Sequence, residues 1–149
     1  MNLSKDFALE AAIKTLKPFD NHPTAEIIEK GFKFANYVLQ PIRNGIGIMQ
    51  ELSFYRSLWV NQAAGGSWNS QHLTMEALDF YPKDMSIAEA YQWIADPDND
   101  IKFGQLILEP SWIHASMMRI GKNNGGTLIY NKAGGYTPYA GGPVRVLDY

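Results

Sequence analysis

The sequence predicts an α+β fold in which helices pack on one face of a mostly antiparallel sheet. Apolar residues recur at helical spacing between residues 24 and 43, a pattern typical of one long core helix. Residues 103–108 and 112–118 have the character of two strands joined by a tight turn around Pro110. A turn of this length favours antiparallel pairing of the two strands.

Length and composition indicate a single globular domain over residues 1–149. A chain of 149 residues is long enough for one core and too short for two. Its 13 Gly and 8 Pro, among 46% apolar residues, are typical of a globular protein with many turns. The formal net charge of -2, without basic or acidic blocks, excludes the electrostatic signature of a protein that binds nucleic acid or a membrane surface. Because cysteine is absent, only His, Asp and Glu remain as ligands for a tight metal site.

The first third of the chain is expected to form two helices and a strand. Residues 1–22 form an N-terminal arm, in which an amphipathic helix over 5–17 is closed by a proline. The long core helix starts at Thr24 and ends near Pro41, since proline interrupts helical hydrogen bonding. A strand is expected over residues 45–55.

Capping and turn signals define the remaining elements. Ser86 and Glu89 form a capping box that starts a helix running to about Ile94. Residues 65–66, both glycine, stop a preceding short helix at a left-handed C-cap. The other expected elements are that short helix, over 57–64, and strands over 76–81, 103–108, 112–118 and near 128. The Gly- and Tyr-rich tail over 131–149 either wraps the surface or docks on a partner.

The chemically informative stretch lies between residues 53 and 79. It reads Ser53-Phe54-Tyr55-Arg56-Ser57, then Asn61, Gly65-Gly66-Ser67, Ser70-Gln71-His72, Ala77 and Asp79. By itself, a histidine near an apolar strand is more often a hydrogen-bonded core residue than a ligand. The combined pattern, however, resembles that of the zinc D-Ala-D-Ala carboxypeptidase-like peptidases, which share their fold with hedgehog signalling domains. The resemblance extends upstream through NLSKDF, DNHP and VLQPIRN and downstream to QLILE and WIHAS.

The resemblance implies one catalytic zinc ion held by His72, Asp79 and His114, the last of them in the sequence Trp112-Ile113-His114. Two imidazoles and one carboxylate leave the fourth tetrahedral position open for water, as a catalytic zinc site requires. Bound zinc lowers the pKa of that water and polarises the scissile carbonyl group. We expect this site in a groove on the sheet face opposite the helices.

A nearby carboxylate must accept the water proton and pass it to the leaving amine. Glu109, just before the turn that leads into the His114 strand, is the favoured base. Glu76 is the competing carboxylate, but strand alternation relative to Asp79 directs its side chain outward. Arg56 resembles the family arginine that stabilises an oxyanion or holds a substrate carboxylate, with a surface arginine as the alternative.

The pattern also suggests roles for three further residues. Ser70 is expected either to bind substrate or to shape the loop before His72. Trp112 either lines a groove for a peptide or belongs to the core. His22 matches a turn and is expected to be structural.

Three positions depart from the family pattern. Phe54 and Met75 stand where the family usually has glycine, and Gly104 stands where relatives often have aspartate. A glycine permits a positive φ angle or a close approach of substrate. The two bulkier side chains are therefore expected to narrow the groove or to alter its specificity.

The resemblance implies a zinc-dependent peptidase that hydrolyses a peptide bond in the stem peptide or cross-link of peptidoglycan. The main alternative is a non-catalytic zinc-binding or structural virion module that keeps the fold. A different metal hydrolase, such as an amidase, would need other motifs, and no H-E-x-x-H sequence is present.

The setting is expected to be a phage or prophage. The N-terminus lacks the basic and apolar regions of a signal peptide, and no stretch approaches the length of a membrane-spanning helix. We therefore expect synthesis in the host cytoplasm and action on the cell wall after release or as a virion component. Phage structural proteins are a further candidate partner, whereas nucleic acid and membrane are not expected as partners.

Overall fold

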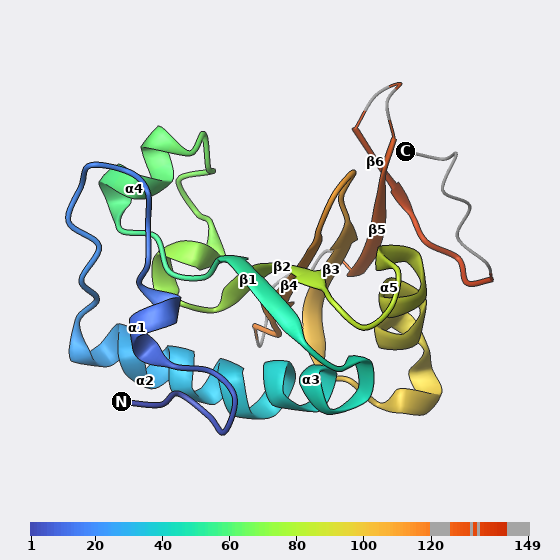
Figure 1. Ribbon diagram of the computed structural model, residues 1–149. Helices are drawn as coiled ribbons and strands as arrows, with labels where there is room; N and C mark the ends of the chain where they lie inside the picture. The colour runs from blue at the N-terminus through green and yellow to red at the C-terminus, as the bar shows by residue number, and fades with distance from the viewer. Residues whose placement is uncertain (120–125, 132, 134, 143–149) are drawn as a thin grey trace.

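The computed structural model describes residues 1–119, 126–131, 133 and 135–142. Its strands are β1 (Met49–Ser53), β2 (Ala77–Pro82), β3 (Phe103–Leu108), β4 (Ile113–Met117), β5 (Gly126–Asn131) and β6 (Gly135–Pro138). Its helices are α1 (Leu9–Ala12), α2 (Ala25–Phe34), α3 (Gln40–Ile46), α4 (Leu58–Ala63) and α5 (Ile87–Ala95), with a π-helical segment η1 (Ala35–Leu39) and two 3-10 helices, η2 (Gln71–Thr74) and η3 (Pro97–Asn99). In Figure 1, the helical run from α2 to α3 lies below the sheet. Within the described residues, no helix has the length and apolar character that crossing a membrane requires.

The six strands form one sheet that is mostly antiparallel, as the sequence predicts. The strand order is β1-β2-β4-β3-β5-β6, and among the described strands only β3 and β5 pair in parallel. His114 lies opposite Asp79 in the β2–β4 pair and opposite Ile107 in the β3–β4 pair. Directly opposed residues direct their side chains to the same face of a sheet. Asp79 and His114 therefore share one face.

The other face of the sheet packs against helices in the hydrophobic core. Buried members of this core include Phe34, Leu39, Ile42, Leu78, Phe80, Tyr91, Ile94, Leu106, Leu108 and Ile113. Leu78 and Phe80 flank Asp79, so the alternation of β2 sends its apolar side chains to the core and the carboxylate to the opposite face. The predicted α+β class, with helices on one face, is confirmed.

The long core helix continues past Pro41, where the sequence predicts its end. It runs from α2 through η1 to α3 and ends at Ile46, with Gly47 at a φ of 82° as the C-cap residue. A proline inside an α-helix lacks the amide hydrogen, and its ring clashes with the carbonyl group four residues earlier. The π-helical turn just before α3 widens the helix at this point, which accommodates Pro41 without ending it.

The strand expected over residues 45–55 is shorter because its first residues belong to α3. A Cβ atom on Gly45 would lie 2.0 Å from the ring of Trp93, so this glycine allows α3 to approach α5 closely. Gly104 on β3 has a similar role, since a Cβ atom there would lie 2.5 Å from the carbonyl oxygen of Met117. Both glycines therefore serve close packing.

The helix expected over residues 5–17 is reduced to the single turn of α1. The Leu3 amide donates to the Phe7 carbonyl oxygen at 2.8 Å, which folds the preceding segment into a tight loop. Leu3 and Phe7 are both buried in the core. The apolar spacing that resembles an amphipathic helix thus belongs to a loop that buries the same residues.

The tail predicted over residues 131–149 partly extends the sheet. β6 pairs with β5, and Tyr136 lies opposite Tyr130. Tyr139 packs edge-on against Tyr91 of α5, with ring centroids 5.2 Å apart. The predicted tail also includes residues 132, 134 and 143–149, which lie outside the described part of the chain.

Candidate metal centre and active site

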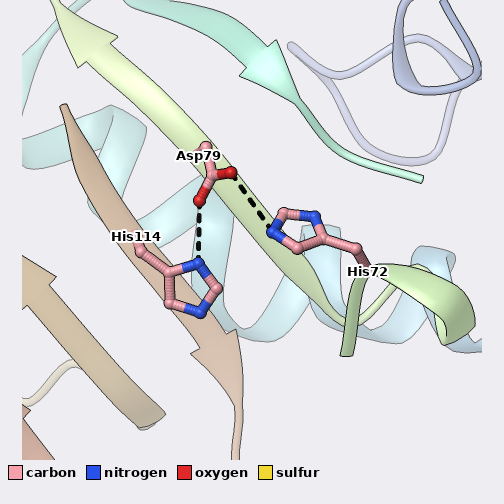
Figure 2. A group of neighbouring side chains, drawn as sticks. All are labelled: His72, Asp79 and His114. Carbon is pink, nitrogen blue, oxygen red and sulfur yellow. Dashed lines mark hydrogen bonds and ion pairs between the residues drawn. The ribbon is translucent and has the colours of Figure 1, made fainter. Parts of the chain in front are cut away.

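Three side chains meet on the sheet face opposite the core helices, as Figure 2 shows. His72 comes from η2, Asp79 from β2 and His114 from β4. The Asp79 carboxylate lies between the two rings, with Oδ1 2.8 Å from His114 Nδ1 and Oδ2 3.3 Å from His72 Nε2. One potential ligand atom from each residue lies within 4.8 Å of the other two. The structure therefore brings together the three residues that the sequence predicts as metal ligands.

The orientation of the His72 ring is fixed by its other nitrogen. Nδ1 lies 2.7 Å from the carbonyl oxygen of Phe54, so Nδ1 carries the hydrogen and donates it, while Nε2 is left free toward Asp79. Burial lowers the pKa of His72, although the neighbouring Asp79 acts in the opposite direction. A neutral imidazole with its second nitrogen hydrogen-bonded to a carbonyl group is the form that binds metal ions.

The loop before His72 is held by Ser70. Its Oγ accepts a hydrogen bond from the His72 amide at 3.3 Å and caps η2. This contact supports the second of the two roles considered for Ser70, namely shaping the loop that presents the histidine.

The two bulky residues that replace family glycines point into the core. Met75 has a φ of 56°, a backbone conformation that favours glycine, yet its side chain is fully buried. A Cβ atom on Gly31 of α2 would lie 2.2 Å from Met75 Sδ, so the sulfur occupies the space beside that glycine. Phe54 is also buried and packs edge-on against Phe34. Both side chains therefore pack in the core, and their expected effect on the width or specificity of the groove stays a prediction.

Arg56 lies against the carboxylate of Asp79. Its Nη2 donates to Asp79 Oδ2 at 2.7 Å, and its Nε donates to Ser53 Oγ at 2.7 Å. The side chain is only 16% exposed, so Arg56 belongs to the site and is not the surface arginine considered as the alternative. A guanidinium in this position can bind a carboxylate or stabilise a developing negative charge.

The donor set fits a zinc ion. Burial alone would raise the pKa of Asp79, but hydrogen bonds and charge interactions with His114 and His72 outweigh burial and hold that pKa well below its usual range. Asp79 is therefore an anionic group between two imidazoles. Two atoms bound to a tetrahedral zinc ion lie about 3.3 Å apart, which is close to the separations of 2.8 and 3.3 Å in this cluster.

Glu109 follows β3 at the turn into β4. Its amide donates to the Trp112 carbonyl oxygen at 3.0 Å, which closes the turn. Glu109 lies two residues after Ile107, which is opposite His114, so Glu109 and His114 project from the same face. Trp112, two residues before His114, belongs to this face and is half-buried. The Glu109 side chain is buried, and burial raises the pKa of its carboxyl group.

Tyr136 of β6 also reaches the site, although the sequence gives no prediction of it. Its hydroxyl donates to Glu109 Oε1 at 2.9 Å. Burial and the nearby Glu109 carboxylate raise the pKa of Tyr136 to about 12, so the hydroxyl keeps its proton near neutral pH. Tyr130 packs edge-on against Tyr136. The only available signal was the aromatic content of the tail, because Tyr136 lies 27 residues from Glu109.

Two residues considered in the sequence lie outside the cluster. Glu76 Oε2 accepts hydrogen bonds from Thr74 Oγ1 at 2.6 Å and from Arg119 Nη2 at 3.3 Å, so its carboxylate is engaged elsewhere. His22 is exposed and pairs with Asp20 in the loop before α2. This contact fits the structural role expected for His22.

The fold and the cluster together define a class of protein. Two histidines and an aspartate, beside a buried carboxylic acid and an arginine, form the arrangement of a metal-dependent hydrolase. The Peptidase M15 family model matches residues 27–116, more than half of the chain, and the match includes the cluster, Arg56 and Glu109 but not Tyr136. The chain therefore belongs to the Peptidase M15 family and is a peptidase. A comparison with curated proteins gives no match.

Proposed function

We propose that the protein is a zinc-dependent peptidase that hydrolyses a peptide bond in the stem peptide or cross-link of peptidoglycan. The convergence of His72, Asp79 and His114 on one sheet face is the observation that carries this proposal. His72 Nε2, an Asp79 carboxylate oxygen and His114 Nδ1 would hold the zinc ion. The chemistry that zinc supplies in such a site is that of a Lewis acid, which activates water and polarises a carbonyl group.

Glu109 is the proposed general base. Its carboxylate accepts a proton from the attacking water and then donates that proton to the leaving amine. Burial raises the pKa of Glu109 above its ordinary value, which makes the carboxylate a better acceptor of the water proton. Tyr136 donates to Oε1 and thereby holds the carboxylate in place, leaving Oε2 for the proton.

Arg56 is proposed to bind negative charge on the substrate. Its hydrogen bonds to Asp79 and Ser53 fix the guanidinium at the edge of the cluster. From there it can stabilise the developing oxyanion or pair with a substrate carboxylate. Trp112 is proposed to border the peptide, while Ser70 shapes the loop that presents His72.

The choice of peptidoglycan as substrate is supported by the motif around Arg56, His72 and Asp79. This motif resembles that of the zinc D-Ala-D-Ala carboxypeptidase-like peptidases. The geometry of the metal-ligand cluster suits the cleavage of several kinds of peptide bond. The proposed substrate class is therefore supported by the motif, and the proposed reaction is supported by the site.

The zinc content of the protein, purified without added metal, tests the site. We expect about one zinc ion per chain, because three protein ligands converge on one position. His114→Ala removes one ligand and should lower the zinc content steeply. His22→Ala removes an exposed histidine outside the cluster and should leave it unchanged. A chain that holds almost no zinc, even after zinc is added, would exclude the proposed site.

A further inference from the structure

A groove of about 710 Å³ lies between the N-terminal arm and β1. Residues 14–17 of the arm line one side, and residues 49–56 of β1 and the following loop line the other. Figure 1 shows the arm passing from α1 toward α4. β1 is the outermost strand of the sheet, so within the described residues one of its backbone edges has no strand partner. Edges of this kind bind extended peptides.

Glu51 of β1 lines this groove with an unpaired carboxyl group. Its Oε2 is buried, and the Glu51 side chain forms no hydrogen bond or ion pair within the described part of the chain. Burial raises the pKa of Glu51 to about 7. Buried polar groups nearly always have a partner, because a buried group without one costs free energy. The position of Glu51 in the wall of an open groove indicates that its partner is a ligand.

The groove reaches the edge of the metal-ligand cluster at Arg56. Ser53 and Arg56 both line it, and Arg56 is hydrogen-bonded to Asp79. Glu51 lies opposite Phe80 and Ser53 lies opposite Asp79, with a register shift between them, so the Glu51 side chain leaves β1 on the face opposite the cluster. Because both residues line the groove, the groove extends round the free edge of β1. A peptide with its scissile bond at the cluster would reach Glu51 with a long side chain that passes round this edge.

The cationic residues that line the groove do not neutralise Glu51. Lys14 and Lys17 are exposed on the arm, and neither is ion-paired with Glu51 in the described structure. Arg56 donates instead to Asp79 and Ser53. The carboxyl group of Glu51 is thus available to a cation supplied by a ligand.

We propose that this groove is a specificity subsite in which Glu51 binds an aliphatic ammonium group of the substrate peptide. The inference rests on the proposed function, because stem peptides contain a diamino acid whose second amine is free until a cross-link acylates it. An ammonium group donates up to three hydrogen bonds and matches the charge of a carboxylate. The subsite would then favour a chain with a free amine over the same chain with an acylated one.

Two peptides that differ only at this amine test the inference. They are L-Ala-γ-D-Glu-L-Lys-D-Ala-D-Ala with a free lysine side chain and the same peptide with that side chain acetylated. Calorimetric titration of the zinc-loaded Glu109→Gln variant measures their binding without turnover. We expect the free amine to bind about tenfold more tightly, as for a charge-assisted hydrogen bond. Glu51→Gln should abolish the difference, whereas Glu29→Gln, on the exposed side of α2, should preserve it.

Equal affinities, or no binding of either peptide, would overturn the subsite. A preference for the free amine that persists in Glu51→Gln would overturn it as well. The comparison of the two peptides does not require a substitution at Glu51. It therefore tests the subsite even if the Glu51→Gln variant does not fold. Cleavage of the two peptides by the wild-type protein tests the proposed function separately. If both peptides are cleaved but bind with equal affinity, the subsite alone is rejected. If binding depends on the amine but neither peptide is cleaved, the proposed function is rejected and the subsite is supported.

Discussion

Two carboxylates were candidates for the general base, and their surroundings separate them. Glu109 is buried on the face of the sheet that carries His114, and it accepts a hydrogen bond from Tyr136. Glu76 precedes β2 and is engaged by Thr74 and Arg119. The alternation argument that directs Glu76 away from the ligands therefore agrees with its observed contacts.

Glu109→Gln should keep the fold and the zinc ion but lower kcat by about two to four orders of magnitude, the usual scale for loss of a general base. Glu76→Gln makes the same carboxyl-to-amide change outside the cluster and should have little effect on kcat. Steady-state hydrolysis of a stem peptide, with zinc content measured on the same samples, makes the comparison. A large loss in Glu76→Gln and none in Glu109→Gln would transfer the role of base to Glu76.

Local sequence signals predict most of the helices and strands. Tertiary contacts account for the elements that differ from the prediction. Ser86 and Glu89 form both hydrogen bonds of the predicted capping box, and β3 occupies residues 103–108 as expected. These signals depend on neighbours in the sequence. The continuation of the long helix through Pro41 depends on the π-helical turn before it, which the apolar pattern does not reveal.

The distinction between sequence signals and tertiary contacts also applies to the candidate site. The resemblance of the motif to the zinc D-Ala-D-Ala carboxypeptidase-like peptidases implies His72, Asp79 and His114 as ligands, and the register of β2 and β4 places the last two side by side. Tyr136 could not be predicted, because the β5–β6 hairpin delivers it to Glu109 from a distant part of the sequence. This contact gives the described part of the tail a role within the domain.

Tyr136→Phe tests the contribution of the hairpin. The hydrogen bond from Tyr136 lowers the pKa of Glu109 against the larger effect of burial, so its loss should raise that pKa further. A base acts only when ionised, and the acidic limb of the kcat/KM profile should therefore move to higher pH. Tyr130→Phe removes a hydroxyl from the neighbouring ring and should leave the limb in place. An unchanged limb in Tyr136→Phe, or a move to lower pH, would show that Tyr136 does not act on Glu109.

At the scale of the whole molecule, Glu51 makes stability depend on pH. Its pKa is about 7 in the folded protein and near the ordinary value of 4.5 in the unfolded chain. Between these values the folded protein keeps a proton that the unfolded chain has lost, so the free energy of unfolding falls as pH rises. Each pKa unit corresponds to about 1.4 kcal/mol, which gives a loss on the order of 3 kcal/mol across this window.

Glu51→Gln should remove this component of the pH dependence. Urea unfolding of the wild-type protein and the variant, measured from about pH 4.5 to about pH 7.5, isolates Glu51 because all other titrating groups are shared. We expect the variant to gain stability relative to the wild type as pH rises, while Glu29→Gln shows no such gain. A stability difference that is constant with pH would mean that the Glu51 carboxyl group titrates normally.

Hydrolysis of peptidoglycan at the cluster of His72, Asp79 and His114 is tested most directly by mass spectrometry of purified peptidoglycan digested with the zinc-loaded protein. We predict new fragments produced by cleavage of one kind of peptide bond. These fragments should be absent when Glu109→Gln or His114→Ala replaces the wild-type protein. Unaltered peptidoglycan in the presence of wild-type protein that holds about one zinc ion per chain would contradict the proposed activity and favour a non-catalytic zinc-binding module.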